Sequence, residues 1–309
     1  MKKKCAFVTG GTNNQFFAMA TLAINLQRIC KNMADELIIF TEQDVAPEEQ
    51  KKVNSIFPTI FILYESPFEN LNSLNAESLR NFSKMVFCKY ECFKLLDEYE
   101  TLIWTDYDVV ILKSMDELKK QFNQHGDIVH AKFLESNIIA GKFDYKLYWH
   151  NYREVLSEMN ISAKAMAAGL FVLYDTFPNY NEFYTECINL TIKYAEWLIL
   201  PEEAVISVLL DKHKIKWESL NEHIWACHPR LDSPDEETKI LHAAWHPKFW
   251  EDGLNNELWN NMYEEWCSKY NGQTIPKIVV EQKKITMIKI IKYLLPYGIV
   301  RFVQRWKVK

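Results

Sequence analysis

Two aspartates one residue apart, Asp106 and Asp108, point most directly to chemistry. They follow an apolar run at residues 102–104 that is typical of a strand buried on both faces. Open α/β sheets bind ligands at the carboxyl ends of their strands, and hard divalent ions take carboxylate oxygens and often bridge them to phosphates. The pair therefore predicts a metal–diphosphate site. The alternative is a pair of strand-end aspartates that cap the following turn.

The composition sets broad limits on the class of protein. The chain has 309 residues, 48% of them hydrophobic and 14% aromatic, which suffices for one large domain or two small ones with a sizeable core. Its seven cysteines are scattered and form no Cys-x-x-Cys pair, so we expect reduced core thiols and a cytoplasmic location. We expect neither a signal peptide nor a membrane-spanning helix, since no apolar run reaches about 18 residues.

Charge is distributed unevenly along the chain. Residues 277–309 hold nine Lys or Arg and one Glu, a net charge of +8, whereas the whole chain carries −5, which leaves −13 on residues 1–276. An acidic body argues against a nucleic-acid partner. The basic tail also carries large apolar residues, a mixture typical of a segment that binds an anionic membrane surface. The alternative is a C-terminal helix that closes over the core.

The first third of the chain alternates strands and helices. We predict strands at residues 6–8, 37–40 and 60–64, and helices at residues 16–29 and 47–54. The alternation favours an α/β fold with a mostly parallel sheet flanked by helices. The loop at residues 9–15 lacks G-x-G-x-x-G, which argues against a dinucleotide site.

The rest of the chain continues the pattern less regularly. Residues 132–165 are rich in aromatics but poorly periodic. We expect either an irregular excursion packed on the core, or a lid or acceptor-binding surface. The other predicted elements are helices at 83–96, 116–122, 181–200, 202–210 and 254–266, and strands at 101–104, 127–131, 169–174 and 240–242.

Three stretches resemble the retaining glycosyltransferases of family 8, the group that includes glycogenin and bacterial lipopolysaccharide galactosyl- and glucosyltransferases. They are Phe-Val-Thr-Gly-Gly-Thr-Asn-Asn-Gln-Phe at residues 7–16, Asp-Tyr-Asp at 106–108, and His-Ala-Ala-Trp-His-Pro-Lys-Phe-Trp at 242–250. The resemblance implies a GT-A fold, the nucleotide-diphospho-sugar transferase fold, over residues 1–270. Residues 271–309 would then be a separate basic amphipathic segment for membrane association.

The third stretch matches the family's H-x-x-G-x-x-K-P-W, with Trp245 in place of the Gly and Phe249 in place of the Pro. The resemblance implies that Asp106, Asp108 and His242 bind Mn²⁺ or Mg²⁺. Two carboxylates and an imidazole suit Mn²⁺. It also implies that Lys248 binds the diphosphate, where an ammonium group helps to neutralise the departing charge.

The resemblance further implies a nucleotide site in which Phe16 stacks on uracil and Lys89 lies near the donor. The residues alone leave an alternative for each position. Phe16 could instead be an ordinary core residue of the first helix, and Lys89 could be a solvated lysine on a helix surface. The implied nucleotide-binding residues are Thr9, Gly10, Thr12, Asn13, Phe16, Lys89, Tyr107, Lys248 and Trp250.

Two departures from the family pattern concern the sugar. Ala167 stands where the family has a sugar-contacting Asn. Glu202 and Glu203 stand where it has Asp-Gln or Asp-Glu at a helix start, and we interpret both as catalytic residues, with Glu203 nearer the reacting face. The alternative is a pair of carboxylates favoured by the helix dipole.

These observations predict a retaining hexosyltransferase that moves a hexose from a UDP-sugar to a glycan or glycolipid acceptor. By the resemblance, the acceptor would belong to bacterial lipopolysaccharide or capsule synthesis, and the enzyme would be peripheral on the inner face of the cell membrane. Two alternatives remain at this point. Asp106-Tyr-Asp-Val-Val110 also fits a haloacid-dehalogenase-type phosphatase, and the departures at Ala167 and Trp245 also suit an inactive membrane-bound scaffold with the same fold.

Overall fold

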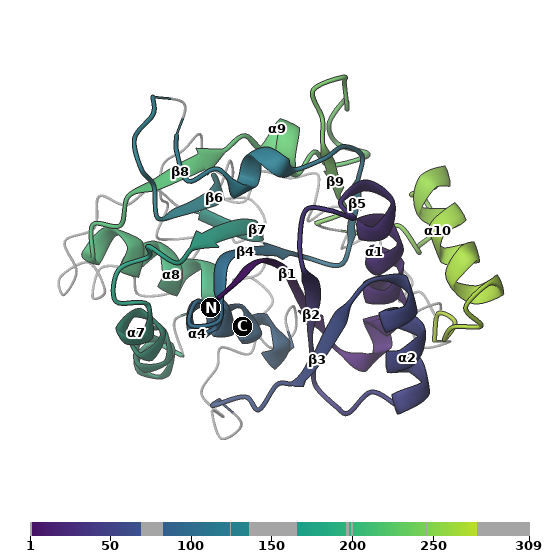
Figure 1. Ribbon diagram of the computed structural model, residues 1–309, viewed down its shortest axis with the longest axis horizontal. Coiled ribbons are helices and arrows are strands. Elements are labelled where there is room, and N and C mark those ends of the chain that lie inside the picture. Colours follow the sequence, from purple (N-terminus) through teal and green to yellow (C-terminus); the bar gives the residue numbers. More distant parts are fainter. Residues whose placement is uncertain are drawn as a thin grey trace, which may run out of the picture. The chain divides into compact units, whose positions relative to one another are not determined.

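The computed structural model describes residues 2–68, 83–123, 125–135, 166–195, 198, 200–244 and 246–276 (Figure 1). The chain divides into two compact units, Met1–Thr274 and Ile275–Lys309. The basic tail at 277–309 and most of the aromatic-rich segment lie outside the described residues, so the membrane and lid interpretations stay predictions. Among the residues described, no helix has the length and apolar character needed to cross a membrane.

A seven-stranded mixed sheet organises the first unit, in the order β3-β2-β1-β4-β7-β6-β8. Its first four strands are parallel: β1 (Lys3–Gly11), β2 (Glu36–Thr41), β3 (Thr59–Leu63) and β4 (Tyr99–Thr105). The long β7 (Met166–Tyr174) is antiparallel to both its neighbours, β4 and β6 (Ala131–Glu135), and β8 (Trp217–Leu220) runs parallel to β6. The α/β fold with a mostly parallel mixed sheet is confirmed. We had not predicted β8.

Helices cover both faces of this sheet (Figure 1). Successive side chains of a strand point to opposite faces, so alternate residues of β1 pack against different helices. Val8 belongs to a core cluster with residues of the left-hand helices in Figure 1, whereas α1 packs against α2 and α10 on the right. The helices are α1 (Phe16–Ile29), α2 (Pro47–Ile56), α4 (Glu91–Leu95), α7 (Tyr180–Lys193), α8 (Pro201–Lys212), α9 (Glu222–Trp225) and α10 (Glu257–Ser268).

Four predicted elements were wrong in type or extent. The helix at 83–96 is a 3-10 helix, η2 (Lys84–Tyr90), that becomes α4 only at Glu91, and the helix at 116–122 is one 3-10 turn, η3 (Asp116–Lys119). The strand predicted at 127–131 begins only at Ala131, because Ile128 pairs instead with Phe122 across an exposed turn. The helix predicted at 181–200 ends at Lys193.

A two-stranded ribbon beside α1 matters most for the site. β5 (Val109–Ile111) pairs antiparallel with β9 (Ile240–His242), and Val109 lies opposite His242. The buried Asn25 of α1 holds this ribbon from the side: its Nδ2 donates to the Ile111 carbonyl at 2.9 Å, and its Oδ1 accepts from the Ile111 N–H at 2.6 Å. A three-residue ladder is weak alone, so this side-chain clamp should help to fix its position.

We expect Asn25→Leu to lower the free energy of unfolding by about 2–4 kcal/mol, because each buried polar group left unpaired on Ile111 costs about 1–3 kcal/mol. Urea denaturation measures the change. The matched control is Asn261→Leu on the exposed face of α10, which should stay within about 0.5 kcal/mol of wild type. Equal losses in the two variants would show that the clamp does not stabilise the ribbon.

Candidate active site

The Asp106–Asp108 segment lies where β4 leaves the main sheet and β5 begins. The Asp106 N–H donates to the Gly169 carbonyl of β7 at 2.9 Å, which extends the β4–β7 ladder by one bond. The indole Nε1–H of Trp104 donates to Asp106 Oδ1 at 2.9 Å and orients that carboxylate. Asp108 is buried and leads directly into β5. The change of sheet between the two residues lets both carboxylates face the same side.

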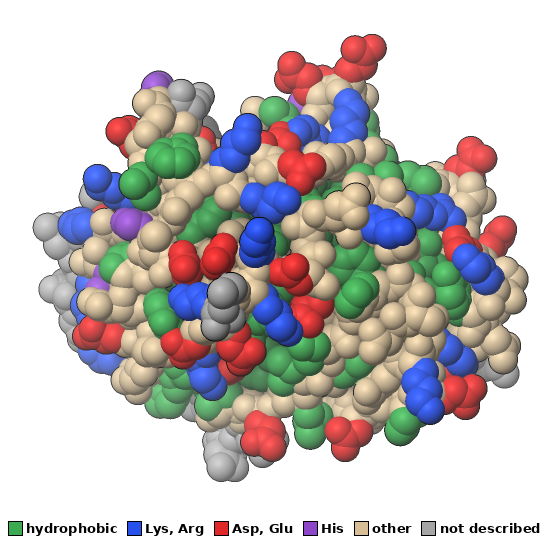
Figure 2. Space-filling view, viewed as in Figure 1, with side chains coloured by type: hydrophobic (Ala, Val, Ile, Leu, Met, Phe, Trp, Pro, Cys, Tyr) green, Lys and Arg blue, Asp and Glu red, His purple; other side chains and the backbone are tan. Residues whose placement is uncertain are grey.

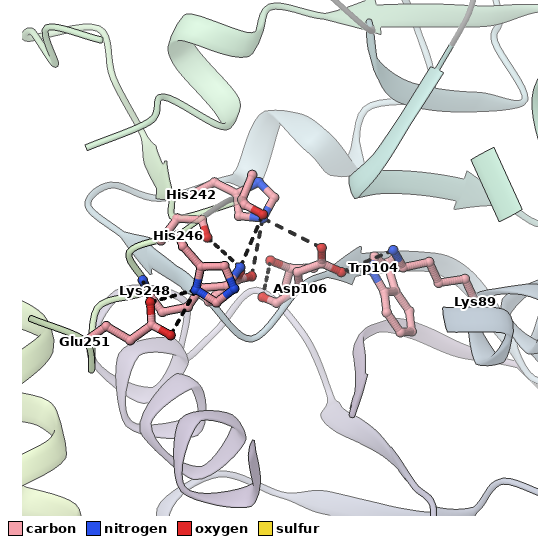
Figure 3. A network of polar contacts seen from close by, with 11 residues as sticks. Lys89, Trp104, Asp106, His242, His246, Lys248 and Glu251 are labelled. Atoms are coloured by element: carbon pink, nitrogen blue, oxygen red, sulfur yellow. Dashed lines mark hydrogen bonds and ion pairs between the residues drawn. The ribbon is translucent and has the colours of Figure 1, made fainter. Parts of the chain in front are cut away.

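His242 meets these carboxylates because β9 pairs with β5. The Ala243 N–H donates to the Asp108 carbonyl at 2.9 Å, which aligns the two chain segments at the site. The Nε2 atom of His242 lies 3.3 Å from Asp108 Oδ1 and 3.7 Å from Asp106 Oδ2 (Figure 3). This nitrogen is buried and has no hydrogen-bond partner within the described part of the chain.

Gly169 makes room for the imidazole. A Cβ atom at this position would lie 2.4 Å from Cε1 and 2.9 Å from Nδ1 of His242, closer than any side chain tolerates. A glycine within a strand often marks such a close approach. The glycine at the start of the predicted strand 169–174 was therefore the available sequence signal for this functional position, which our predictions missed.

The charged groups of this cluster shift one another's pKa values. Burial alone would raise the pKa of Asp108, but the Lys248 ammonium and the His242 imidazole outweigh it and lower that pKa well below its ordinary value. Burial would lower the pKa of His242, and the Asp108 and Asp106 carboxylates instead raise it. Both shifts follow from placing opposite charges together where little water reaches.

Lys248 closes one side of the cluster. Its Nζ forms an ion pair with Asp108 and donates to the carbonyls of Ala243 at 2.7 Å and Ala244 at 3.2 Å (Figure 3). The loop that carries Lys248 is held by Glu251, whose Oε2 accepts from the Lys248 N–H at 2.8 Å and whose carboxylate also meets Nδ1 of His246. The ammonium is thus held against the carboxylates from a different part of the chain.

A second ionic network continues from Asp106 away from His242. The buried Lys89 of η2 lies 3.4 Å from Asp106 Oδ1 and 3.0 Å from Glu202 Oε1 at the start of α8. Burial would lower the pKa of Lys89, but these two carboxylates raise it above its ordinary value. The interpretation of Lys89 as a solvated lysine was therefore wrong, because the tight 3-10 turns of η2 place this residue inside the site.

Glu203 lies beside this network with a different partner. Its Oε1 accepts the Ala168 N–H of β7 at 2.8 Å, and its side chain is partly exposed. Burial and the neighbouring Glu202 carboxylate raise the pKa of Glu203 from 4.5 to about 7. A partly exposed carboxyl group whose pKa is raised to about 7 is a candidate for chemistry at a reacting centre.

The predicted nucleotide residues lie at the ends of β1 and β4. Gly10 and Gly11 let neighbouring side chains pack directly on the backbone. A Cβ at Gly10 would lie 2.7 Å from Cys88 Sγ, and a Cβ at Gly11 would lie 2.7 Å from the Tyr107 ring. The Tyr107 ring stacks on Trp250 at a centroid distance of 6.2 Å. The Gly11–Tyr107 contact joins the opening loop to the aspartate segment, as the carboxyl ends of parallel strands should.

The remaining nucleotide predictions differ in their placement. Thr9 Oγ1 and Asn13 Oδ1 are buried without a hydrogen-bond partner among the described residues, and the Thr12 hydroxyl donates to Gln15. The ring of Phe16 is buried and packs against Phe61 and Trp266, each at 6.2 Å. This placement fits the core interpretation of Phe16 and leaves its ring packed against protein side chains.

The donor set fits a divalent cation. One ligand atom from each of Asp106, Asp108 and His242 lies within 4.8 Å of the others. The Nε2 atom of His242 is directed at two carboxylates and makes no hydrogen bond within the described residues. Two oxygens and one imidazole nitrogen are ligands that Mn²⁺ accepts, and Mg²⁺ shares the preference for oxygen.

Solved structures with the same fold include glycosyltransferases. Galactosyltransferase LgtC, solved with donor and acceptor sugar analogues, has a TM-score of 0.64 and 11% identity, covering 88% of this chain and 98% of LgtC. The bifunctional WbbM has a TM-score of 0.63 and 10% identity, covering 88% of this chain, which spans about half (52%) of WbbM. GlyE from Streptococcus pneumoniae TIGR4 has a TM-score of 0.54 and 18% identity, covering 87% of this chain and 64% of GlyE. At such low sequence identities, the structural similarity establishes the GT-A fold and nothing more specific.

No curated protein sequence matches the chain. The family model described as glycosyl transferase family 8, however, matches residues 9–252, a span that contains the opening loop, both aspartates, His242 and Lys248. A match over most of the chain removes the phosphatase alternative, because the Asp-x-Asp segment then belongs to a glycosyltransferase domain. This chain is a member of glycosyl transferase family 8.

Proposed function

We propose that this protein is a retaining, metal-dependent glycosyltransferase that moves a hexose from a UDP-sugar to a hydroxyl group of a glycan or glycolipid acceptor. The observation that carries the proposal is the convergence of three ligand atoms: the buried Nε2 of His242, which makes no hydrogen bond within the described residues, lies 3.3 Å from Asp108 Oδ1 and 3.7 Å from Asp106 Oδ2. The likeness to LgtC, a galactosyltransferase solved with donor and acceptor sugar analogues, supports the choice of a hexose.

The metal site and Lys248 would act on the departing diphosphate. Asp106, Asp108 and His242 would hold Mn²⁺ or Mg²⁺, which when bound supplies positive charge that stabilises the leaving UDP. The Lys248 ammonium is held in place by two backbone carbonyls. It is therefore positioned before the substrate arrives and supplies charge where negative charge develops.

The nucleotide would lie over the ends of β1 and β4. Gly11 lets the Tyr107 ring pack against the opening loop, and Tyr107 with Trp250 offers an aromatic surface there. The unpaired Thr9 hydroxyl and Asn13 carbonyl oxygen supply polar atoms to the same region. These contacts support binding of a uridine nucleotide.

The sugar would lie between the metal cluster and the start of α8. Lys89 and Glu202 form a buried pair that leaves Glu203 as the more exposed carboxylate beside Ala168. We assign Glu203 to the reacting face, where an ionised carboxylate stabilises positive charge on the anomeric carbon or attacks it as a nucleophile. Glu202 holds Lys89, and through it Asp106, in position.

The acceptor and the location rest on the sequence and the family. We propose an acceptor of bacterial lipopolysaccharide or capsule synthesis, and attachment of the basic segment 271–309 to the anionic inner face of the cell membrane. Figure 2 shows acidic and basic side chains interspersed on the face it displays, which together with the acidic body supports a function without nucleic acid.

We expect Asp108→Asn to reduce Mn²⁺-dependent hydrolysis of a UDP-hexose by at least about 100-fold, because even a change to a group that only supports a metal ligand costs about 10–100-fold. Release of UDP from a panel of UDP-hexoses measures the rate. The control is Asp116→Asn, at a carboxylate whose side chain is 64% exposed.

Unchanged turnover in Asp108→Asn would overturn the metal assignment. If the wild type binds UDP and Mn²⁺ and yet turns over no nucleotide sugar with any acceptor, the inactive-scaffold interpretation is the better one.

We expect Gly169→Ala to weaken Mn²⁺ binding by about tenfold or more although it removes no ligand. The new Cβ would displace the His242 imidazole that lies 2.4 Å from it, and misplaced support around a ligand costs about 10–100-fold in affinity. Titration calorimetry with Mn²⁺ gives the affinity. The control is Gly126→Ala, where a Cβ meets nothing within 4 Å and the strain comes only from the positive φ of 83°. An equal loss of Mn²⁺ affinity there would contradict the steric argument at Gly169.

We expect Glu203→Gln to stabilise the fold above neutral pH while it lowers activity. The folded-state pKa of about 7 lies above the ordinary 4.5, so ionisation of Glu203 costs stability. The cost is absent below about pH 4.5, grows as the pH rises, and is complete above about pH 7, where it reaches about 2–3 kcal/mol. Glutamine keeps an oxygen for the Ala168 N–H but carries no charge.

Urea denaturation at pH 5 and pH 8 tests this prediction, with Glu98→Gln at an exposed position as the control. The gain should be large at pH 8 and fall to about a quarter of that size at pH 5, while UDP-hexose hydrolysis falls by about 100-fold. A gain of the same size at both pH values would contradict the raised pKa of Glu203.

A further inference from the structure

His228 is a buried residue of the site region that the proposed mechanism does not use. After α9 the chain runs beside β9, where Cys227 forms a parallel bridge with Leu241. The Cys227 N–H donates to the Ile240 carbonyl, and the His242 N–H donates to the Cys227 carbonyl, both at 3.0 Å. His228 therefore follows directly after the residue that holds the backbone of a metal ligand.

The hydrogen bonds of His228 determine which ring nitrogen carries the proton. Its Nδ1 accepts the backbone N–H groups of Arg230 at 3.2 Å and Leu231 at 3.1 Å. Burial lowers the pKa of His228, so the ring is neutral at pH 7 and its proton is on Nε2. The residue is only 8% exposed, and this N–H has no acceptor among the described residues.

An unpaired buried donor costs about 1–3 kcal/mol and is rare in folded proteins. Nδ1 alone secures the turn at residues 230–231, so the structure gives Nε2–H no role in folding. A donor of this kind, next to a ligand site, is accounted for most simply by an acceptor atom that arrives with a ligand.

The charges around His228 indicate the kind of acceptor. Besides burial, the Lys248 and Arg230 cations lower the pKa of His228, whereas the Asp232 carboxylate raises it. The Asp232 carboxylate accepts the His228 backbone N–H at 2.8 Å and is thereby engaged. Arg230 is exposed, makes no ion pair within the described part of the chain, and has its Nη1 3.9 Å from where a Cβ of Gly253 would lie.

We propose that Nε2–H of His228 and the guanidinium of Arg230 form an oxyanion-binding subsite beside Lys248, and that it takes a phosphate-class group. A neutral donor together with two cations suits phosphate oxygens better than sugar hydroxyls. The group comes from the donor diphosphate or from a phosphate on the acceptor. The assignment to these two sources rests on the proposed function, whereas the subsite itself does not.

Two substitutions at His228 distinguish the roles of its two ring nitrogens. His228→Asn keeps an oxygen near the Nδ1 position for the turn at residues 230–231 but removes the Nε2 donor, whereas His228→Gln carries an N–H donor near the Nε2 position. Arg230→Gln changes an exposed side chain and leaves the fold intact. The matched control is Lys214→Gln, at an exposed lysine whose side chain is 76% exposed.

Titration calorimetry compares three probes: uridine, UDP with Mn²⁺, and inorganic phosphate added with and without saturating UDP and Mn²⁺. Loss of a hydrogen bond to a charged group weakens binding by about tenfold or more. If the donor supplies the oxyanion, His228→Asn and Arg230→Gln weaken UDP by that factor and leave uridine unchanged. If the acceptor supplies it, UDP is unchanged and phosphate binding to the UDP-loaded protein is weakened instead.

In either case His228→Gln should recover affinity toward wild type, and Lys214→Gln should bind all probes as wild type does. The subsite is overturned if UDP and phosphate affinities in His228→Asn and Arg230→Gln both stay within about twofold of wild type. Wild-type protein that binds phosphate but not UDP would refute the proposed function and retain the subsite. Wild type that binds neither would refute both.

Discussion

The site depends on an imidazole held between two carboxylates where little water reaches. Such an arrangement is costly unless the charges are paired, and His242 Nε2 meets both carboxylates at ion-pair distance without a hydrogen bond to either. Its position follows from one short ladder, in which β9 lies against β5 and brings residues more than a hundred positions apart into register. Asn25 holds the ribbon, and Gly169 leaves the volume that the ring occupies.

Ionic contacts extend from this cluster in two directions, and the groups on the two sides differ. On one side Lys248 supplies a fixed positive charge next to Asp108, which suits a departing diphosphate. On the other side Lys89 joins Asp106 to Glu202 and leaves Glu203 to accept only a backbone N–H. A buried ion pair is weak evidence of stability. In the proposed function, this network would keep Glu202 and Glu203 at a fixed position relative to the metal ligands.

The departures from the family pattern have a physical meaning in this structure. Ala167 offers no side-chain amide to a sugar, but its neighbour Ala168 donates its N–H to Glu203, so β7 still contributes to the sugar side. Glu203 in place of a neutral amide adds a carboxyl group whose pKa is raised to about 7. Under the proposed function, this carboxyl group would give the sugar side of the site an ionisable group in place of an amide.

The sequence alone determined the parts that are local. Apolar periodicity predicted α1 to its observed bounds, the Asp-x-Asp segment followed from its place after a buried run, and the spacing from His242 to Lys248 and Trp250 pointed to the family. Only the tertiary structure decided that β7 runs antiparallel in the middle of the sheet, that η2 places Lys89 inside the site, and that Phe16 lies in the core. The reason is that periodicity reports which residues avoid water, whereas direction, register and the space around a ring arise from contacts between distant segments.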